Sequence, residues 1–178
     1  MVVTGADAST AETMSATGRI DASPEAVFGV LADTGSHAAI DGTGWVCEAL
    51  DTAPLTAAGQ VFRMAMYHSD HPNGRYVVAN EVQVLSRPHV IAWRPGYDTD
   101  NSTLAFGGWV WRYDLDWKDG GTQVTLSYDW SAITDEARKA QSFPPFGVEH
   151  LIASLDHLAD LAQATTPSQD PHAGRTSS

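Results

Sequence analysis

The sequence predicts an α+β fold in which a curved antiparallel sheet wraps around one long C-terminal helix. In the stretch 147–164, apolar residues such as Leu151, Leu155 and Leu158 recur at three- and four-residue steps, with acidic residues on the opposite side. Between residues 109 and 117, every second residue is Trp, Tyr or Leu, which is typical of a half-buried strand. Several further alternating segments precede that strand. When a sheet with one apolar face packs against a helix with one apolar stripe, the apolar face and the apolar stripe are both buried.

The other expected elements follow in chain order. They are a strand near Met14–Asp21, a helix opened by Ser23-Pro24-Glu25, a short helix at Ser36–Ile40, and strands at Trp45–Leu50, Val61–His68, Arg75–Leu85, His89–Pro95 and Gln123–Trp130. Asn73-Gly74 and Asp119-Gly120-Gly121 are hairpin signals. The segment 96–108 has no periodicity, so we expect a loop over a cavity mouth, and whether it gates the cavity stays open.

The domain organisation expected from composition is simple. Residues 14–164 form one domain, while 1–13 and 165–178, rich in small and polar residues, form a disordered leader and tail. The length of 178 residues and a hydrophobic content of 43% suit one globular domain. The oligomeric state stays open.

The charge and the single cysteine restrict the function classes. Ten Lys and Arg against 22 Asp and Glu give a formal net charge of −12, which disfavours nucleic acid and anionic membrane surfaces as partners. Cys47 alone excludes an internal disulfide and a multi-cysteine metal site. The sequence shows neither a signal peptide nor a membrane span, so we expect a cytoplasmic protein.

Three stretches resemble a known superfamily. The strand followed by Ala22-Ser23-Pro24-Glu25-Ala26-Val27-Phe28, the Gly120-Gly121-Thr122 hairpin, and the Ser154-Leu155-x-x-Leu158 helix are similar to the SRPBCC superfamily, which includes START domains and the birch-pollen allergen. The resemblance spans about Ser15 to Leu161 and is greatest to its polyketide cyclase/dehydratase-like branch. It implies a helix-grip fold with an elongated apolar cavity between sheet and long helix. It implies no single activity, because members include carriers, receptors, cyclases and chaperone-associated proteins.

A ligand cavity would be lined by large side chains from the inward rows of the strands and the apolar stripe of the helix. The predicted set is Phe62, Met64, Met66, Trp93, Trp109, Trp111, Tyr128, Leu151 and Leu155. The aromatic members, with Trp130, fit either a filled core or a wall for a flat apolar ligand.

Two polar residues with inward parity are the predicted catalytic candidates. His68 continues the row of Phe62, Met64 and Met66, and a histidine among apolar neighbours would be a neutral proton acceptor. Asn80 lies in an apolar row, where an amide needs a partner in the core or on a ligand. In the competing interpretation, His68 lies at a solvent-exposed hairpin end and has no catalytic role. Arg63 has outward parity.

No metal or cofactor is expected. His68-Ser69-Asp70-His71 places three metal-ligand types together, but a solvated hairpin end explains this cluster better. His150 and His157 flank the apolar stripe of the long helix, where histidines are usually structural. The sequence lacks phosphate-loop, dinucleotide, serine-hydrolase and zinc-protease motifs.

Three functions therefore stay open. The leading one is binding of a hydrophobic or aromatic small molecule in an internal cavity. The second is an enzyme, a cyclase or dehydratase acting on a polyketide-like intermediate, with polar side chains polarising a carbonyl. The third is an interaction module similar to the chaperone-ATPase activators, which would need an exposed apolar patch.

Overall fold

The computed structural model describes residues 2–10, 12–101, 103–140 and 142–165, and of residues 2–10 and 140 only the backbone. The strands are β1 (Val2–Thr10), β2 (Thr13–Ile20), β3 (Val46–Ala49), β4 (Val61–Tyr67), β5 (Arg75–Ser86), β6 (Val90–Asp98), β7 (Leu104–Phe106), β8 (Val110–Lys118) and β9 (Gly121–Asp129). The helices are α1 (Pro24–Ala32), the 3₁₀ helix η1 (Thr34–Ser36), α2 (His37–Ile40), α3 (Asp135–Ala140) and α4 (Val148–Thr165).

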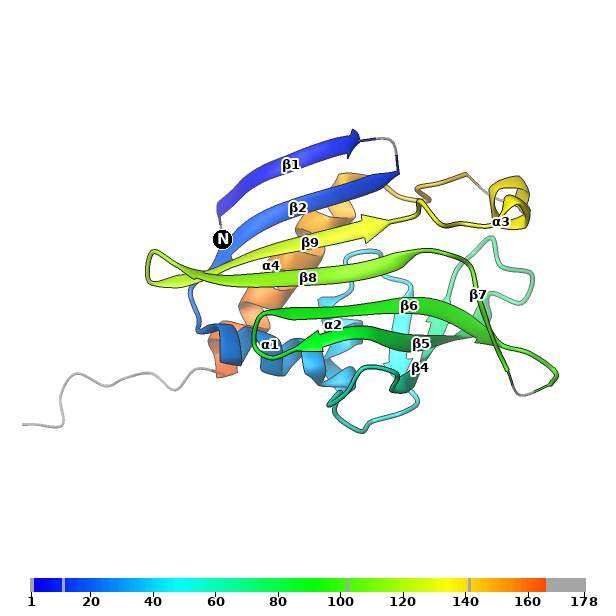
Figure 1. The fold of residues 1–178 in the computed structure, drawn as a ribbon, viewed down its shortest axis with the longest axis horizontal. Helices are drawn as coiled ribbons and strands as arrows, with labels where there is room; N and C mark the ends of the chain where they lie inside the picture. The colour runs from blue at the N-terminus through cyan, green and yellow to red at the C-terminus, as the bar shows by residue number, and fades with distance from the viewer. Residues whose placement is uncertain (1, 11, 102, 141, 166–178) are drawn as a thin grey trace, which may run out of the picture.

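Within these residues, all nine strands join one antiparallel sheet. Its order is β1-β2-β9-β8-β6-β5-β4-β3, and β7 pairs with β6 outside this path. Figure 1 shows α4 crossing behind the sheet, with α1 and α2 beside its lower end and β4 turning back around the same side. The helix contacts β2, β9, α1 and α2. The predicted α+β architecture is confirmed.

The core forms where α4 meets the sheet. Leu151, Leu155 and Leu158 are fully buried and share one apolar cluster with Tyr113 and Leu115 of β8. The helix itself lies against β2 and β9, and the β8 side chains belong to the same apolar core. Trp117, expected on the same buried face, is instead 60% exposed, because it lies near the hairpin end of β8, opposite Thr122, outside that cluster.

Local signals set the start of α1 and the β8–β9 turn. The side chain of Ser23 accepts a hydrogen bond from the Ala26 backbone N–H at 3.2 Å, and Pro24 occupies the first helical turn. At the hairpin, Asp119 and Gly120 both have positive φ angles, 52° and 79°. Two such residues match the twist of a two-residue hairpin.

Two segments expected to be irregular contain strands. Most of the predicted leader is β1, whose backbone pairs with the otherwise open edge of β2. The predicted loop 96–108 is partly a hairpin, because β6 continues to Asp98 and pairs with β7. Pairing there depends on backbone hydrogen bonds, so the side chains need not show the alternation of a strand buried on one face.

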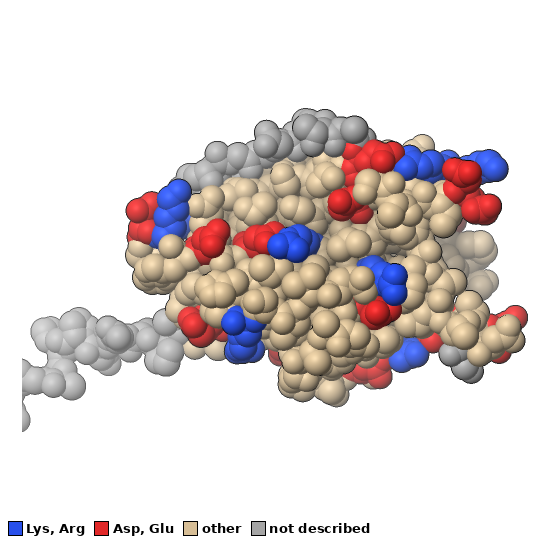
Figure 2. Space-filling view, viewed as in Figure 1, with Lys and Arg blue, Asp and Glu red and all other residues tan. Residues whose placement is uncertain are grey.

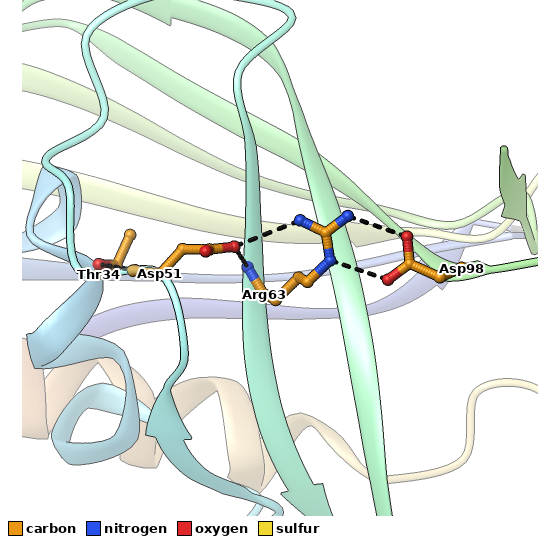
Figure 3. Close-up of polar contacts among 4 residues, drawn as sticks. All are labelled: Thr34, Asp51, Arg63 and Asp98. Atoms are coloured by element: carbon orange, nitrogen blue, oxygen red, sulfur yellow. Dashed lines mark hydrogen bonds and ion pairs between the residues drawn. The ribbon is translucent and has the colours of Figure 1, made fainter. Parts of the chain in front are cut away.

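Arg63 faces away from the core, as its parity predicted, and joins three segments (Figure 3). Its guanidinium donates two hydrogen bonds to Asp98, at 2.8 and 2.9 Å, and lies 3.5 Å from Asp51. Asp51 also accepts from the Arg63 backbone N–H, and its carbonyl accepts from the Thr34 hydroxyl. The hydrogen bonds from Arg63 lower the pKa of the Asp98 carboxyl.

This pair predicts a pH-dependent contribution to stability. A carboxyl with a lowered folded-state pKa stabilises the fold above its unfolded-state pKa, and that contribution is lost as the pH falls through the folded-state value. Urea unfolding should therefore show Asp98→Asn less stable than wild type at neutral pH, with the gap closing in acid. Asp116→Asn, which removes an exposed carboxylate without an ion pair among the described residues, is the control. A gap for Asp98→Asn that is constant with pH would contradict the prediction.

Candidate functional site

The structure contains a cavity of about 710 Å³. Its walls come from β4, β5, β6, β8 and β9, from α2 and the following corner, and from the segment before α4. The predicted cavity residues that line it are Met64, Met66, Trp93, Trp109, Trp111 and Tyr128. Phe62, Leu151 and Leu155 are instead fully buried in the core. The leucines of α4 lie in the apolar cluster shared with β2 and α1, so this helix contributes Ser154 to the cavity wall.

Aromatic rings form one wall of the cavity. The Trp111 ring stacks on Phe146, with centroids 5.5 Å apart and an interplanar angle of 14°, and Tyr128 lies 4.6 Å from Trp111. Phe146 belongs to the segment before α4, and the sequence analysis did not single it out. Such a wall suits the face of a flat apolar molecule.

The inner part of the cavity holds a histidine that the sequence analysis also missed. The His37 ring stacks on Trp93 at 5.1 Å and meets the edge of Phe62 at 5.3 Å. Nε2 lies 2.8 Å from the Leu31 carbonyl oxygen, so Nε2 carries the proton that it donates. Burial lowers the pKa of His37, opposed by that hydrogen bond and by Asp33. The sequence feature that could have indicated His37 is its spacing from the apolar Ile40, because residues three apart lie on the same face of a helix.

Asn80 lies in the wall of the same cavity. Its side chain is 5% exposed, and its neighbours across the sheet are Phe62 on β4 and Pro95 on β6. The side-chain amide has no hydrogen-bond partner in the part of the chain that the structure describes. A buried amide without a protein partner favours a ligand or water as its partner.

His68 lines the cavity at its mouth, past the end of β4. Its ring is half-buried, meets the edge of Trp45 at 4.6 Å, and accepts a hydrogen bond at Nδ1 from the Asp70 N–H. Since Asn80 pairs with Phe62, six residues back along β4, the two catalytic candidates lie about 20 Å apart along the strand.

Three further histidines, His71, His150 and His157, contact other parts of the fold. Nδ1 of His150 lies 2.9 Å from the Gly42 carbonyl oxygen, and Nδ1 of His157 lies 3.3 Å from that of Ile40. Both contacts connect α4 to α2 and its following corner. His71 stacks on Tyr76, and burial raises the pKa of that phenol to about 12.

The described residues bring no three His, Cys, Asp or Glu side chains together in an arrangement that would hold a metal ion. No helix within them has the length and apolar character needed to cross a membrane. On the face shown in Figure 2, basic side chains are scattered among acidic ones and form no basic patch.

No family model and no curated protein matches this sequence. Solved structures do match its fold. Protein Ms6760 from Mycobacterium smegmatis has a TM-score of 0.66 at 18% identity, covering 93% of this chain and 100% of that one. The Zhui aromatase/cyclase from Streptomyces sp. R1128 has a TM-score of 0.59 at 17% identity, covering 85% and 93%. An AHSA1-like protein from Aeromonas hydrophila has a TM-score of 0.53 at 16% identity, covering 85% and 92%.

The chain therefore has the architecture of a class in which a curved sheet closes around one long helix. This is the helix-grip fold that the sequence resemblance implied.

Proposed function

We propose that the protein binds a hydrophobic or aromatic small molecule in this cavity, as a polyketide cyclase/dehydratase-like member of the helix-grip class. The observation that carries the proposal is the combination of stacked aromatic walls with Asn80, a buried amide that has no protein partner among the described residues. A space of about 710 Å³ lies within the range of small-molecule sites. The likeness to an aromatase/cyclase supports the choice of ligand class.

Two adjacent valines of β5 give a matched test. Val78 is buried and lines the cavity, whereas Val77 is 42% exposed and does not line it. We expect the neutral dye N-phenyl-1-naphthylamine to fluoresce on binding wild-type protein. Val78→Phe should weaken its binding about tenfold or more, because the added ring occupies ligand space, while Val77→Phe should bind like wild type.

Thermal unfolding of both variants would establish that they fold. Equal binding by a folded Val78→Phe variant, or no binding by wild type across a panel of neutral aromatic dyes, would contradict the proposal.

The geometry favours the hypothesis of ligand binding without reaction over the hypothesis of an enzyme that uses His68 and Asn80. A general acid or base must reach the group that it protonates or deprotonates, and these residues lie at opposite parts of the cavity. A cyclase or dehydratase in this cavity would use His37 beside Asn80 instead. The interaction-module hypothesis requires an exposed apolar patch, whereas a cavity lined by aromatic and apolar side chains favours a small molecule.

A further inference from the structure

Three polar side chains each lie beside Phe62 or Trp93 in the inner part of the cavity. His37 contacts both rings, Asn80 is the cross-strand partner of Phe62, and Tyr113 stacks on Trp93 at 5.8 Å. All three line the cavity and are at most 8% exposed. They therefore supply polar groups beside the aromatic rings of this part of the cavity.

These polar groups have free hydrogen-bonding capacity of a defined kind. The single proton of neutral His37 is donated to the Leu31 carbonyl, which leaves Nδ1 as a pure acceptor. Among the described residues, Nδ1, the Asn80 amide and the Tyr113 hydroxyl have no partner. A ligand that satisfies them presents one donor to Nδ1 and one acceptor to Asn80 or Tyr113. A hydroxyl group supplies both.

The charges around the cavity restrict the ligand further. Its described lining contains Asp41 and Asp70 but no Lys or Arg. Both oxygens of Asp41 already accept hydrogen bonds from its own corner, from Thr43, Trp45 and Val46. A carboxylate or phosphate would enter without a cation to offset its desolvation, in a chain of net charge −12. These charges therefore disfavour an anionic ligand.

We propose that the inner end of the cavity selects a neutral hydroxylated aromatic ligand, whose hydroxyl donates to His37 Nδ1 and accepts from Asn80 or Tyr113, with the ring held among the aromatic walls. This inference rests on the proposed function and specifies its ligand class. His37 is the residue that distinguishes a hydroxyl from an ether at the same position, because only the hydroxyl has a proton to donate.

Three naphthalenes test the proposal by displacing N-phenyl-1-naphthylamine: 2-naphthol, 2-methoxynaphthalene and 2-naphthoate. Wild-type protein should bind 2-naphthol about tenfold more tightly than the methyl ether, since the ether leaves a buried acceptor unpaired. The naphthoate should bind at least about tenfold more weakly than 2-naphthol.

His37→Gln retains an N–H for the Leu31 carbonyl and replaces the ring Nδ1 with an amide oxygen beside that N–H, so the acceptor no longer lies where Nδ1 lies. It should reduce the preference for the hydroxyl to within about twofold while the methyl ether still binds. His89→Gln changes an exposed histidine outside the cavity and should retain the tenfold preference. Circular dichroism would verify the fold of each variant.

The outcomes separate the two proposals. If no naphthalene displaces the dye and the dye itself does not bind, the proposed function fails. If the dye and 2-methoxynaphthalene bind but wild type shows no preference for 2-naphthol, the inference fails alone. An unchanged preference in a folded His37→Gln variant, its loss in His89→Gln, or tighter binding of 2-naphthoate would also overturn the inference.

Discussion

Leu155→Ala should lower the free energy of unfolding by about 2–5 kcal/mol, the usual range for a leucine removed from a packed core. Leu155 is fully buried in the middle of α4, in the apolar cluster that includes Tyr113 and Leu115 of β8. Truncation removes apolar contacts and leaves a cavity between helix and sheet, and both effects act in the same direction. Urea unfolding followed by circular dichroism measures the change.

Leu161→Ala is the matched control, because Leu161 is on the same helix but only partly buried. It should cost less than about 1.5 kcal/mol, since less apolar area leaves water on folding. If Leu155→Ala lowered the free energy of unfolding by less than about 0.5 kcal/mol, the helix would not pack against the sheet as the structure shows. Equal losses for the two leucines would contradict the burial difference that the structure shows.

Gly42→Ala should destabilise the fold by about 1–3 kcal/mol or more, because a side chain there has no space. A Cβ at Gly42 would overlap the His150 carbonyl oxygen and lie 2.8 Å from the Ser154 backbone nitrogen, both on α4. The Gly42 N–H donates to the Ser154 hydroxyl at 2.9 Å, and the Gly42 carbonyl accepts from His150. The corner would have to move away from the helix and lose these bonds.

Gly29→Ala provides the contrast in the same measurement. Gly29 lies inside α1, where the nearest atom to an added Cβ is a side-chain nitrogen of Arg87 at 4.0 Å. Replacing a helical glycine by alanine there should raise the free energy of unfolding by about 0.5–1 kcal/mol. A Gly42→Ala variant as stable as wild type would contradict the close contact that the structure shows between this corner and α4.

The main elements of the fold could be predicted because their patterns are local. The three- and four-residue spacing of Leu151, Leu155 and Leu158 defines the buried stripe of α4 without any knowledge of its partner. The strands β1 and β7 could not be predicted in this way. Each is fixed by backbone pairing with a neighbour already in the sheet, and that neighbour is identified only once the fold has formed.

The cavity could be predicted in part, for a related reason. Strand alternation places Met64 and Met66 on the inner face, because that parity is a local property. His37 and Phe146 reach the cavity from a four-residue helix and a proline-containing segment, whose positions depend on tertiary packing. The distance between His68 and Asn80 follows from the pairing register of β4 and β5, which inward parity alone does not give.

Methionine methyl resonances test the central claim, that the cavity binds a neutral aromatic molecule, most directly. Met64 and Met66 line the cavity, whereas Met14 is buried in the core outside it. In protein labelled with ¹³C at the methionine methyl groups, titration with 2-naphthol should shift the Met64 and Met66 signals along one saturable curve and leave Met14 unchanged. Saturable binding that leaves Met64 and Met66 unshifted, or no binding at all, would contradict the account.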